Sequence, residues 1–281
     1  MASIYKSSAL CTALFSILLL TACGGGNSEP PSSEPHESTD LPTIVKTQGF
    51  YEGTISNGNV YNAFVLNDGR IFTFYAKLST DAPGEFDVDG FLQGQVTSAL
   101  ISDTGNSFTA SMKDYSIPGV ATPGTLSATY KSGSGFDGKI AGPDGAVLGT
   151  FTGKTANVAG YNFHSPAALT DISGSWSISN VESGLISTVG GTLRVGADGA
   201  ISGALNDSCV FSGTLKPHSD VNIFDMTVQF DSGASCKLSG QSATGIVVSV
   251  KDDNGEPVFI AIGTDTKQTQ GLLIVGERSV G

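Results

Sequence analysis

The chain has 281 residues, with 26 Asp or Glu against 14 Lys or Arg and a formal net charge of −12 at pH 7. Because an acidic surface repels phosphate backbones, and because no basic stripe with interleaved aromatic residues occurs, we expect no nucleic-acid binding. The 37 glycines and the low charged fraction of 14% suit tight turns and closely approaching strands better than helices.

The first 22 residues have the pattern of an export signal. One cation, Lys6, precedes an uncharged and mostly apolar run over residues 13–20, and small residues follow. This run is too short to cross a membrane as a helix. We therefore interpret residues 1–22 as a signal peptide.

The residues Leu20-Thr21-Ala22-Cys23 resemble the lipobox of bacterial lipoproteins at every position. The resemblance implies cleavage by signal peptidase II before Cys23, a diacylglyceryl group on its thiol, and three acyl chains such as palmitate, as in Gram-negative lipoproteins. Since each buried methylene adds about 0.8 kcal/mol, several chains anchor a protein stably in a bilayer. Gly24 rather than Asp at the next position implies the outer membrane. The alternative is an ordinary secretory peptide cut near Ala22, which leaves Cys23 as a free thiol.

Residues 23–47 are rich in Gly, Ser, Pro and Glu and lack apolar periodicity. Such a segment buries too little apolar surface to offset its ordering entropy, so we predict a disordered tether. Its Pro-containing part should extend by up to roughly 3 Å per residue, which would hold the folded part away from the lipid headgroups.

From residue 49 onward, turn signals such as Asn57-Gly58, Asp68-Gly69 and Asp198-Gly199 recur at short spacing. Between them apolar and polar residues alternate, as they do over residues 223–230, and this combination is typical of antiparallel hairpins. The first series of predicted strands covers residues 49–56, 60–66, 70–78, 87–97, 107–113, 124–131, 136–141 and 146–153.

The alternation pauses over residues 155–170, which we interpret as a linker with room for one helical turn. A second series of predicted strands follows. It covers residues 174–179, 187–195, 199–205, 209–216, 221–230, 235–238, 243–251, 257–263 and 270–277.

We interpret the two series as a degenerate duplication, because each opens with an aromatic residue just after a glycine, in Gly49-Phe50 and in Gly174-Ser175-Trp176. Eight antiparallel strands can close into a barrel and so remove exposed sheet edges. The predicted fold is all-β, with two small eight-stranded barrels in tandem over residues 48–154 and 171–281, each folding independently. The alternatives are two β-sandwiches and a single large barrel.

The lipobox, the Gly- and Pro-rich tether, the eight-stranded lobes and the last strand, residues 271–276, resemble surface lipoproteins such as transferrin-binding protein B. The resemblance implies barrels and a surface location, but no ligand-contacting motif of that family matches a position here. Gly174-Ser175-Trp176 also resembles the G-x-W start of lipocalins. A packed barrel floor is the alternative interpretation of that motif.

The four cysteines predict one disulfide. Cys11 leaves with the signal peptide and Cys23 is consumed by lipid, so Cys209 and Cys236 remain in an oxidising compartment. Cys209 is in phase with Phe211, which places its thiol in the interior of the second lobe, and the phase of Cys236 agrees. The alternative is two buried free thiols.

No group of residues predicts catalysis, a cofactor or a metal site. His36, His164 and His218 fall in loops without a second ligand at metal spacing, and we expect solvated side chains there. The acidic stretches at residues 87–90 and 252–256 lack the further carboxylate that an EF-type calcium loop needs, and we interpret them as hairpin turns.

The sequence therefore predicts a noncatalytic lipoprotein of the cell envelope, anchored in the outer membrane by lipid on Cys23. We expect its two lobes to bind a macromolecule or to mediate adhesion, on either the periplasmic face or the cell surface. One alternative is a carrier that encloses a small apolar ligand in one barrel. An enzyme is the third.

Overall fold

The computed structural model describes residues 47–80, 86–102, 105–116, 121–131, 135–183, 187–188, 190–205, 209–233, 236, 238–252 and 255–279. The predicted signal peptide, Cys23 and the predicted tether up to residue 46 lie outside the described residues. Within the described ranges, no helix has the length and hydropathy that a membrane crossing requires.

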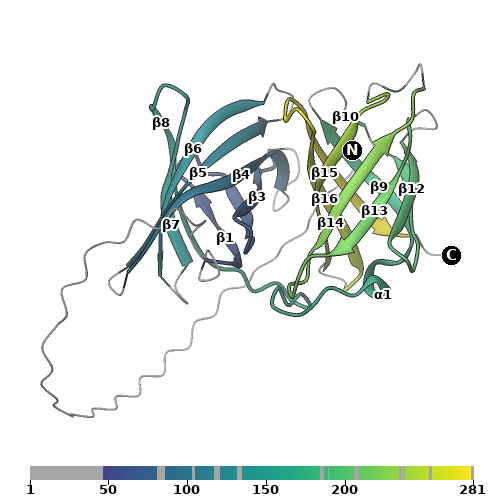
Figure 1. Cartoon of the computed structure of the whole chain (residues 1–281), viewed down its shortest axis with the longest axis horizontal. Coiled ribbons are helices and arrows are strands. Elements are labelled where there is room, and N and C mark those ends of the chain that lie inside the picture. Colours follow the sequence, from purple (N-terminus) through teal and green to yellow (C-terminus); the bar gives the residue numbers. More distant parts are fainter. Residues whose placement is uncertain are drawn as a thin grey trace, which may run out of the picture.

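The first eight strands form a closed antiparallel barrel, coloured purple to teal in Figure 1. Each strand pairs with its neighbours in sequence, and β1 also pairs with β8, which closes the sheet. The strands are β1 (Gly49–Ile55), β2 (Val60–Val65), β3 (Arg70–Leu78), β4 (Phe86–Ser102), β5 (Gly105–Ser116), β6 (Thr122–Lys131), β7 (Gly135–Ala141) and β8 (Val147–Thr155). The predicted first barrel is confirmed.

The second barrel closes through the pairing of β9 with β17, while the short β10 pairs only with β9. One helical turn, α1 (Leu169–Ile172), precedes it. Its strands are β9 (Gly174–Ser183), β10 (Ser187–Thr188), β11 (Gly191–Val195), β12 (Ala200–Leu205), β13 (Cys209–Pro217), β14 (Phe224–Phe230), β15 (Ser242–Lys251), β16 (Pro257–Asp265) and β17 (Gly271–Arg278). Eight of these strands form the closed sheet, so the tandem of barrels is confirmed.

Of the predicted strand over residues 235–238, the structure describes Cys236 and Leu238, and the prediction is wrong for both because neither lies in a strand. The described residues there lie in successive turns, in which the Cys236 N–H donates to the Gly233 carbonyl at 3.1 Å and the Gln241 N–H donates to the Leu238 carbonyl at 3.0 Å. Each of these hydrogen bonds spans three residues, as in a turn, and neither Cys236 nor Leu238 is paired with a neighbouring strand. The apolar alternation of Cys236 and Leu238 reflects burial in a loop rather than a strand.

Aromatic side chains fill both barrel interiors. In the first barrel, Tyr61, Phe136 and Phe151 are at most 4% exposed and their rings meet edge to face. Glycines on neighbouring strands make room for such rings: a Cβ on Gly138 would lie 2.5 Å from the Phe151 ring, and one on Gly203 in the second barrel would lie 2.4 Å from the Phe211 ring. A side chain at either glycine would therefore displace the core.

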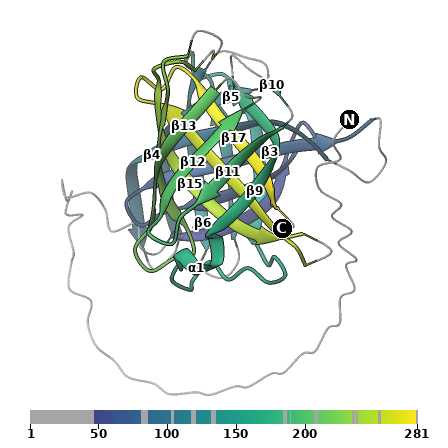
Figure 2. The same cartoon turned by 90° about the vertical axis from the view of Figure 1, so that its right-hand side faces the viewer.

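The two barrels stand side by side in Figure 1 and one behind the other in Figure 2. A third apolar core, which we call the seam, is formed by residues of both barrels. Outward-facing residues on β1 to β5 meet outward-facing residues on β15 to β17. The seam comprises Phe50, Phe64, Leu66, Phe72, Phe91, Tyr115, Tyr161, Phe163, Val221, Ile223, Ile246, Val248, Val250, Val258, Ile260, Ile262, Leu273 and Val275.

Close contacts show how tightly the barrels approach at the seam. A Cβ on Gly271 of the second barrel would lie 2.4 Å from the Phe91 ring and 2.8 Å from Tyr115 of the first barrel. Lys113 on β5 donates a hydrogen bond to the carbonyl of Gln268 in the β16–β17 turn at 2.8 Å. The two barrels are therefore packed directly against each other, in addition to being joined by the linker.

Candidate functional site

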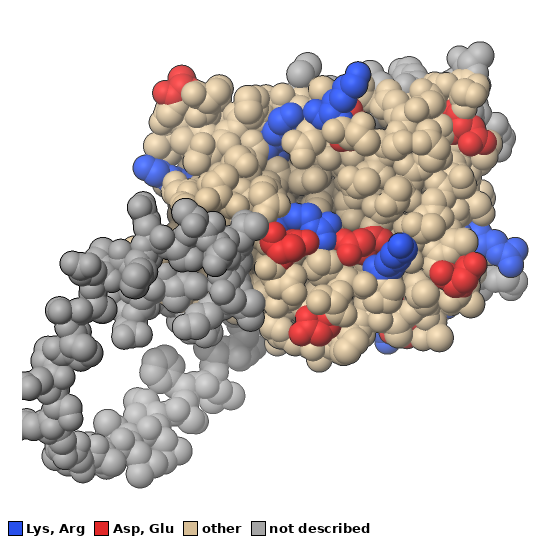
Figure 3. Space-filling view, in the orientation of Figure 1, with Lys and Arg blue, Asp and Glu red and all other residues tan. Residues whose placement is uncertain are grey.

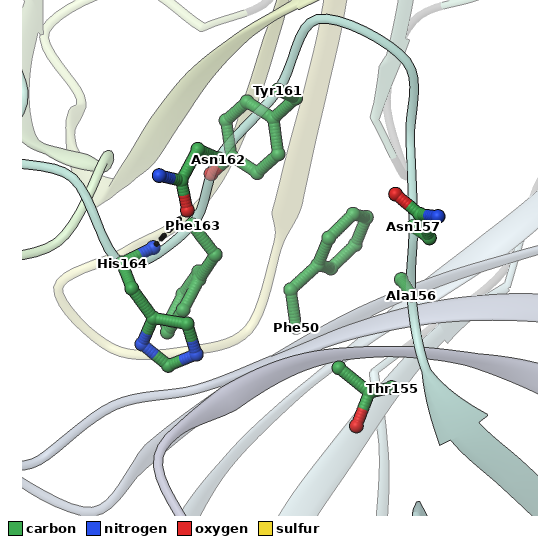
Figure 4. A pocket seen from close by; sticks show the side chains of 8 residues that line it. All are labelled: Phe50, Thr155, Ala156, Asn157, Tyr161, Asn162, Phe163 and His164. Atoms are coloured by element: carbon green, nitrogen blue, oxygen red, sulfur yellow. Dashed lines mark hydrogen bonds between the residues drawn. The ribbon is translucent and has the colours of Figure 1, made fainter. Parts of the chain in front are cut away.

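A pocket of about 260 Å³ lies at one end of the seam, where the chain leaves β8 and enters the linker (Figure 4). Phe50 comes from β1, Thr155 ends β8, and the other lining residues belong to the linker. The lining residues are Phe50, Thr155, Ala156, Asn157, Tyr161, Asn162, Phe163 and His164.

Three rings form the floor of this pocket. Phe50, Tyr161 and Phe163 are all buried. The Phe50 ring stacks on Phe64 with centroids 4.5 Å apart and meets the Tyr161 ring edge-on at 5.6 Å. The Tyr161 hydroxyl donates to the backbone carbonyl of Asn222 at 2.7 Å, and burial raises its pKa. Contacts with residues of both barrels therefore fix the position of the floor.

The rim of the pocket is polar and exposed. Asn162 Oδ1 accepts a hydrogen bond from the His164 N–H at 3.1 Å, which fixes the turn, and the His164 ring stands edge-on to Phe163 at 5.1 Å. The side chains of Thr155, Asn157 and His164 form no hydrogen bond with any other described residue. None of the lining residues is Lys, Arg, Asp or Glu.

The predicted solvated loop at His164 agrees with the exposure of that side chain, but the prediction for His218 is wrong. His218 is 7% exposed, and its Nδ1 lies 2.8 Å from Asp225 Oδ2 and 3.1 Å from Arg70 Nη2. The packing of the two barrels covers the turn that carries it, which alternation along one strand does not reveal. His36 lies outside the described residues.

These contacts form part of a polar clasp across the seam, made of Asp68, Arg70, His218 and Asp225. The Arg70 guanidinium of β3 lies 2.7 Å from Asp225 on β14 and 2.7 Å from Asp68. Burial by itself would raise the pKa of the Asp225 carboxyl, but hydrogen bonds from His218 and Arg70 hold that pKa below its usual value. Basic and acidic side chains lie side by side where the barrels meet, on a face that is otherwise mostly uncharged (Figure 3).

The predicted disulfide between Cys209 and Cys236 is present, with the two Cα atoms 4.7 Å apart. Both residues are buried in the core of the second barrel, Cys209 on β13 as its phase predicted and Cys236 from a loop. The bond joins the start of β13 to the loop that follows β14. Cys23, the predicted lipidation site, lies outside the described residues.

The Trp176 of the G-x-W motif packs at the floor of the second barrel. It is 1% exposed, and its Nε1–H donates to the Ile172 carbonyl at 2.9 Å. The Arg278 guanidinium lies 5.1 Å from the indole centroid and donates to the carbonyls of Asp171 and Ser173. Together with α1, these residues close one end of the barrel.

The acidic stretch at residues 87–90 lies within strand β4, so the interpretation of it as a hairpin turn is wrong. Asp89 pairs with Lys77 at 2.9 Å and also accepts from Asn59 at 3.4 Å, while residues 253 and 254 of the second stretch lie outside the described residues. In the described part of the chain, no three His, Cys, Asp or Glu side chains are grouped so as to hold a metal ion.

Comparison with protein-family models and with curated proteins finds no match for this chain. The pocket and its surroundings are therefore interpreted from their geometry. Sequence reasoning missed this pocket because its rings come from β1 and from a linker more than 100 residues further along the chain. The only signal in the sequence was the cluster Tyr161-Asn162-Phe163-His164, aromatic and polar in a segment without alternation.

Proposed function

We propose that this protein is a noncatalytic lipoprotein of the outer membrane that binds a macromolecule through the outer surface of its paired barrels. Lipid on Cys23 would anchor it, and the tether of residues 23–47 would hold the barrels away from the headgroups. The observation that carries the binding part is the packing of the barrels: buried rings occupy their described interiors, and the pocket opens outside them at the seam.

This packing favours surface binding over carriage of an apolar ligand inside a barrel. In the second barrel, Trp176, Phe211 and Phe259 are each 1% exposed and belong to one continuous core. A small eight-stranded barrel either fills with side chains or keeps one ligand cavity. The rings of Trp176 and Phe259 are in contact, with centroids 5.6 Å apart, and this packing supports the filled alternative.

The anchor is tested by the Cys23→Ser variant in cells that process lipoproteins, with Cys11→Ser as the matched control. We expect Cys23→Ser to appear in the soluble fraction or to accumulate as uncleaved precursor, while Cys11→Ser stays with the outer membrane. A correctly cleaved Cys23→Ser protein that remained in the membrane fraction would contradict the proposal. Protease added to intact cells would then distinguish the cell surface from the periplasmic face.

A further inference from the structure

We propose that the pocket at the end of the seam binds one neutral sugar ring, so that the macromolecule recognised by this protein is a glycan. The inference rests on the proposed binding function and names its ligand class. It is carried by the aromatic floor of Phe50, Tyr161 and Phe163 and by three polar rim residues whose side chains form no hydrogen bond with another described residue: Thr155, Asn157 and His164.

The size of the pocket selects a small ligand. Its volume of about 260 Å³ lies just under the roughly 300 to 1,000 Å³ of sites for drug-sized molecules. A water molecule takes about 30 Å³ in the liquid, so the space exceeds what one or two ordered waters fill. A single six-membered ring fits, and because the pocket opens at the surface, the rest of a glycan can extend into solvent.

The floor and the rim match the two faces of a sugar. The C–H groups of a pyranose form apolar patches, which can pack against the small exposed parts of the three floor residues, each at most 9% exposed. Its hydroxyls both donate and accept hydrogen bonds, and so do the carboxamide of Asn157, the hydroxyl of Thr155 and the imidazole of His164. None of these three side chains forms a hydrogen bond with another described residue, so a ligand can use their polar atoms without breaking an internal hydrogen bond.

The lining also selects against charged ligands. Without Lys or Arg, the pocket offers no permanently charged cationic partner for a carboxylate or phosphate, and without Asp or Glu it offers no anionic partner for an amine. An ionised group would lose hydration there without a compensating ion pair. The ligand class is therefore neutral hexoses, pentoses and N-acetylhexosamines rather than uronic acids or amino sugars.

The pocket is organised before a ligand arrives. The Tyr161 hydroxyl is tied to Asn222, the Phe50 ring is stacked on Phe64, and the Asn162 carboxamide holds the turn to His164. A rigid site loses little conformational freedom on binding, so modest contacts can still give measurable affinity.

The test uses the purified protein and a panel of methyl glycosides of neutral hexoses, pentoses and N-acetylhexosamines, with glucuronate and glucosamine as charged counterparts. Saturation-transfer NMR detects binding, and titration of the side-chain amide signals of Asn157 and Asn162 locates it. We expect millimolar binding of at least one neutral glycoside, with shifts at both amides and weaker binding of the charged analogues.

Variants then connect the signal to the pocket. Asn157→Ala and Thr155→Ala should each weaken binding about three- to tenfold, the loss expected for one hydrogen bond. Thr125→Ala, an exposed threonine on β6 of the same barrel, is the matched control and should leave binding unchanged. All three positions are exposed, so circular dichroism should show unaltered folding.

The inference is overturned if no neutral glycoside binds, if Asn157→Ala and Thr155→Ala bind as the control does, or if a charged analogue binds as tightly as its neutral counterpart. These results differ from failure of the proposed function. If the protein is anchored in the membrane but binds no glycoside, the sugar site is wrong and the proposed anchor is unaffected. If the protein binds a glycoside but is found in the soluble fraction, the proposed anchor is wrong and the sugar site is still supported.

Discussion

Separating the two barrels should expose the seam and destabilise both. The proposed perturbation is expression of residues 46–160 and 168–281 as separate chains, the division that the linker suggests. The second fragment alone would expose eight aliphatic side chains that the seam buries: Ile246, Val248, Val250, Val258, Ile260, Ile262, Leu273 and Val275.

The free energy of burial lost at the seam decides whether a fragment can fold alone. At about 1.5 kcal/mol for each such side chain, these eight positions represent up to roughly 12 kcal/mol of lost burial. That is comparable with the whole net stability of a domain, about 5 to 15 kcal/mol. We therefore expect each fragment to self-associate or to fold incompletely, which replaces the independent folding expected from the sequence.

The assay is size-exclusion chromatography with light scattering, together with dye binding to exposed apolar surface and thermal melts followed by circular dichroism. Mixing the two fragments should restore a one-to-one complex with the dye response of the full chain. In the full chain, Ile262→Asp at the seam should lower the melting temperature far more than Val210→Asp, at a position that is 48% exposed. Two monomeric fragments that bind no dye and melt cooperatively at the temperature of the full chain would refute this reasoning.

Two further predictions concern the disulfide and the clasp. Reducing the Cys209–Cys236 bond should lower the free energy of unfolding by about 3 to 4 kcal/mol on the chain-entropy model, given a sequence separation of 27. Thermal melts with and without reductant measure this, and two alkylatable thiols in unreduced, denatured protein would contradict it. Asp225→Asn should cost about 1 kcal/mol at pH 7, a modest value because the Asp225 side chain is 39% exposed. Because the clasp lowers the pKa of Asp225, that contribution is present above the usual carboxyl pKa of 3.8 and is lost as the pH falls through the lowered value. The difference between wild type and Asp225→Asn in denaturant melts should therefore shrink below about pH 4, and a difference independent of pH would exclude a role for the charge.

Local patterns in the sequence were enough to predict the barrels. Period-two alternation between Asx-Gly turns located most strands to within a few residues. The exceptions are β4, β5 and β9, which extend further, the predicted strand 187–195, which is the two strands β10 and β11, and Cys236, which lies in a loop. The phase of Cys209 with Phe211 placed the Cys209 thiol in the interior of the second barrel. Strand positions and the side-chain phase within a strand depend on residues that are close in the chain or on the paired strand. A regular local pattern in the sequence is therefore enough to predict them.

The seam and its pocket depend on contacts that no local pattern reports. Strand β16 is buried on both faces, with Phe259 and Ala261 in the barrel and Ile260 and Ile262 in the seam, which in sequence is only a continuous apolar run. Arg70 meets Asp225 across 155 positions, and Phe50 meets Tyr161. Which outer faces come together is decided by the packing of two finished barrels. That packing brings together side chains that are far apart in the sequence and that no repeating sequence pattern relates to one another.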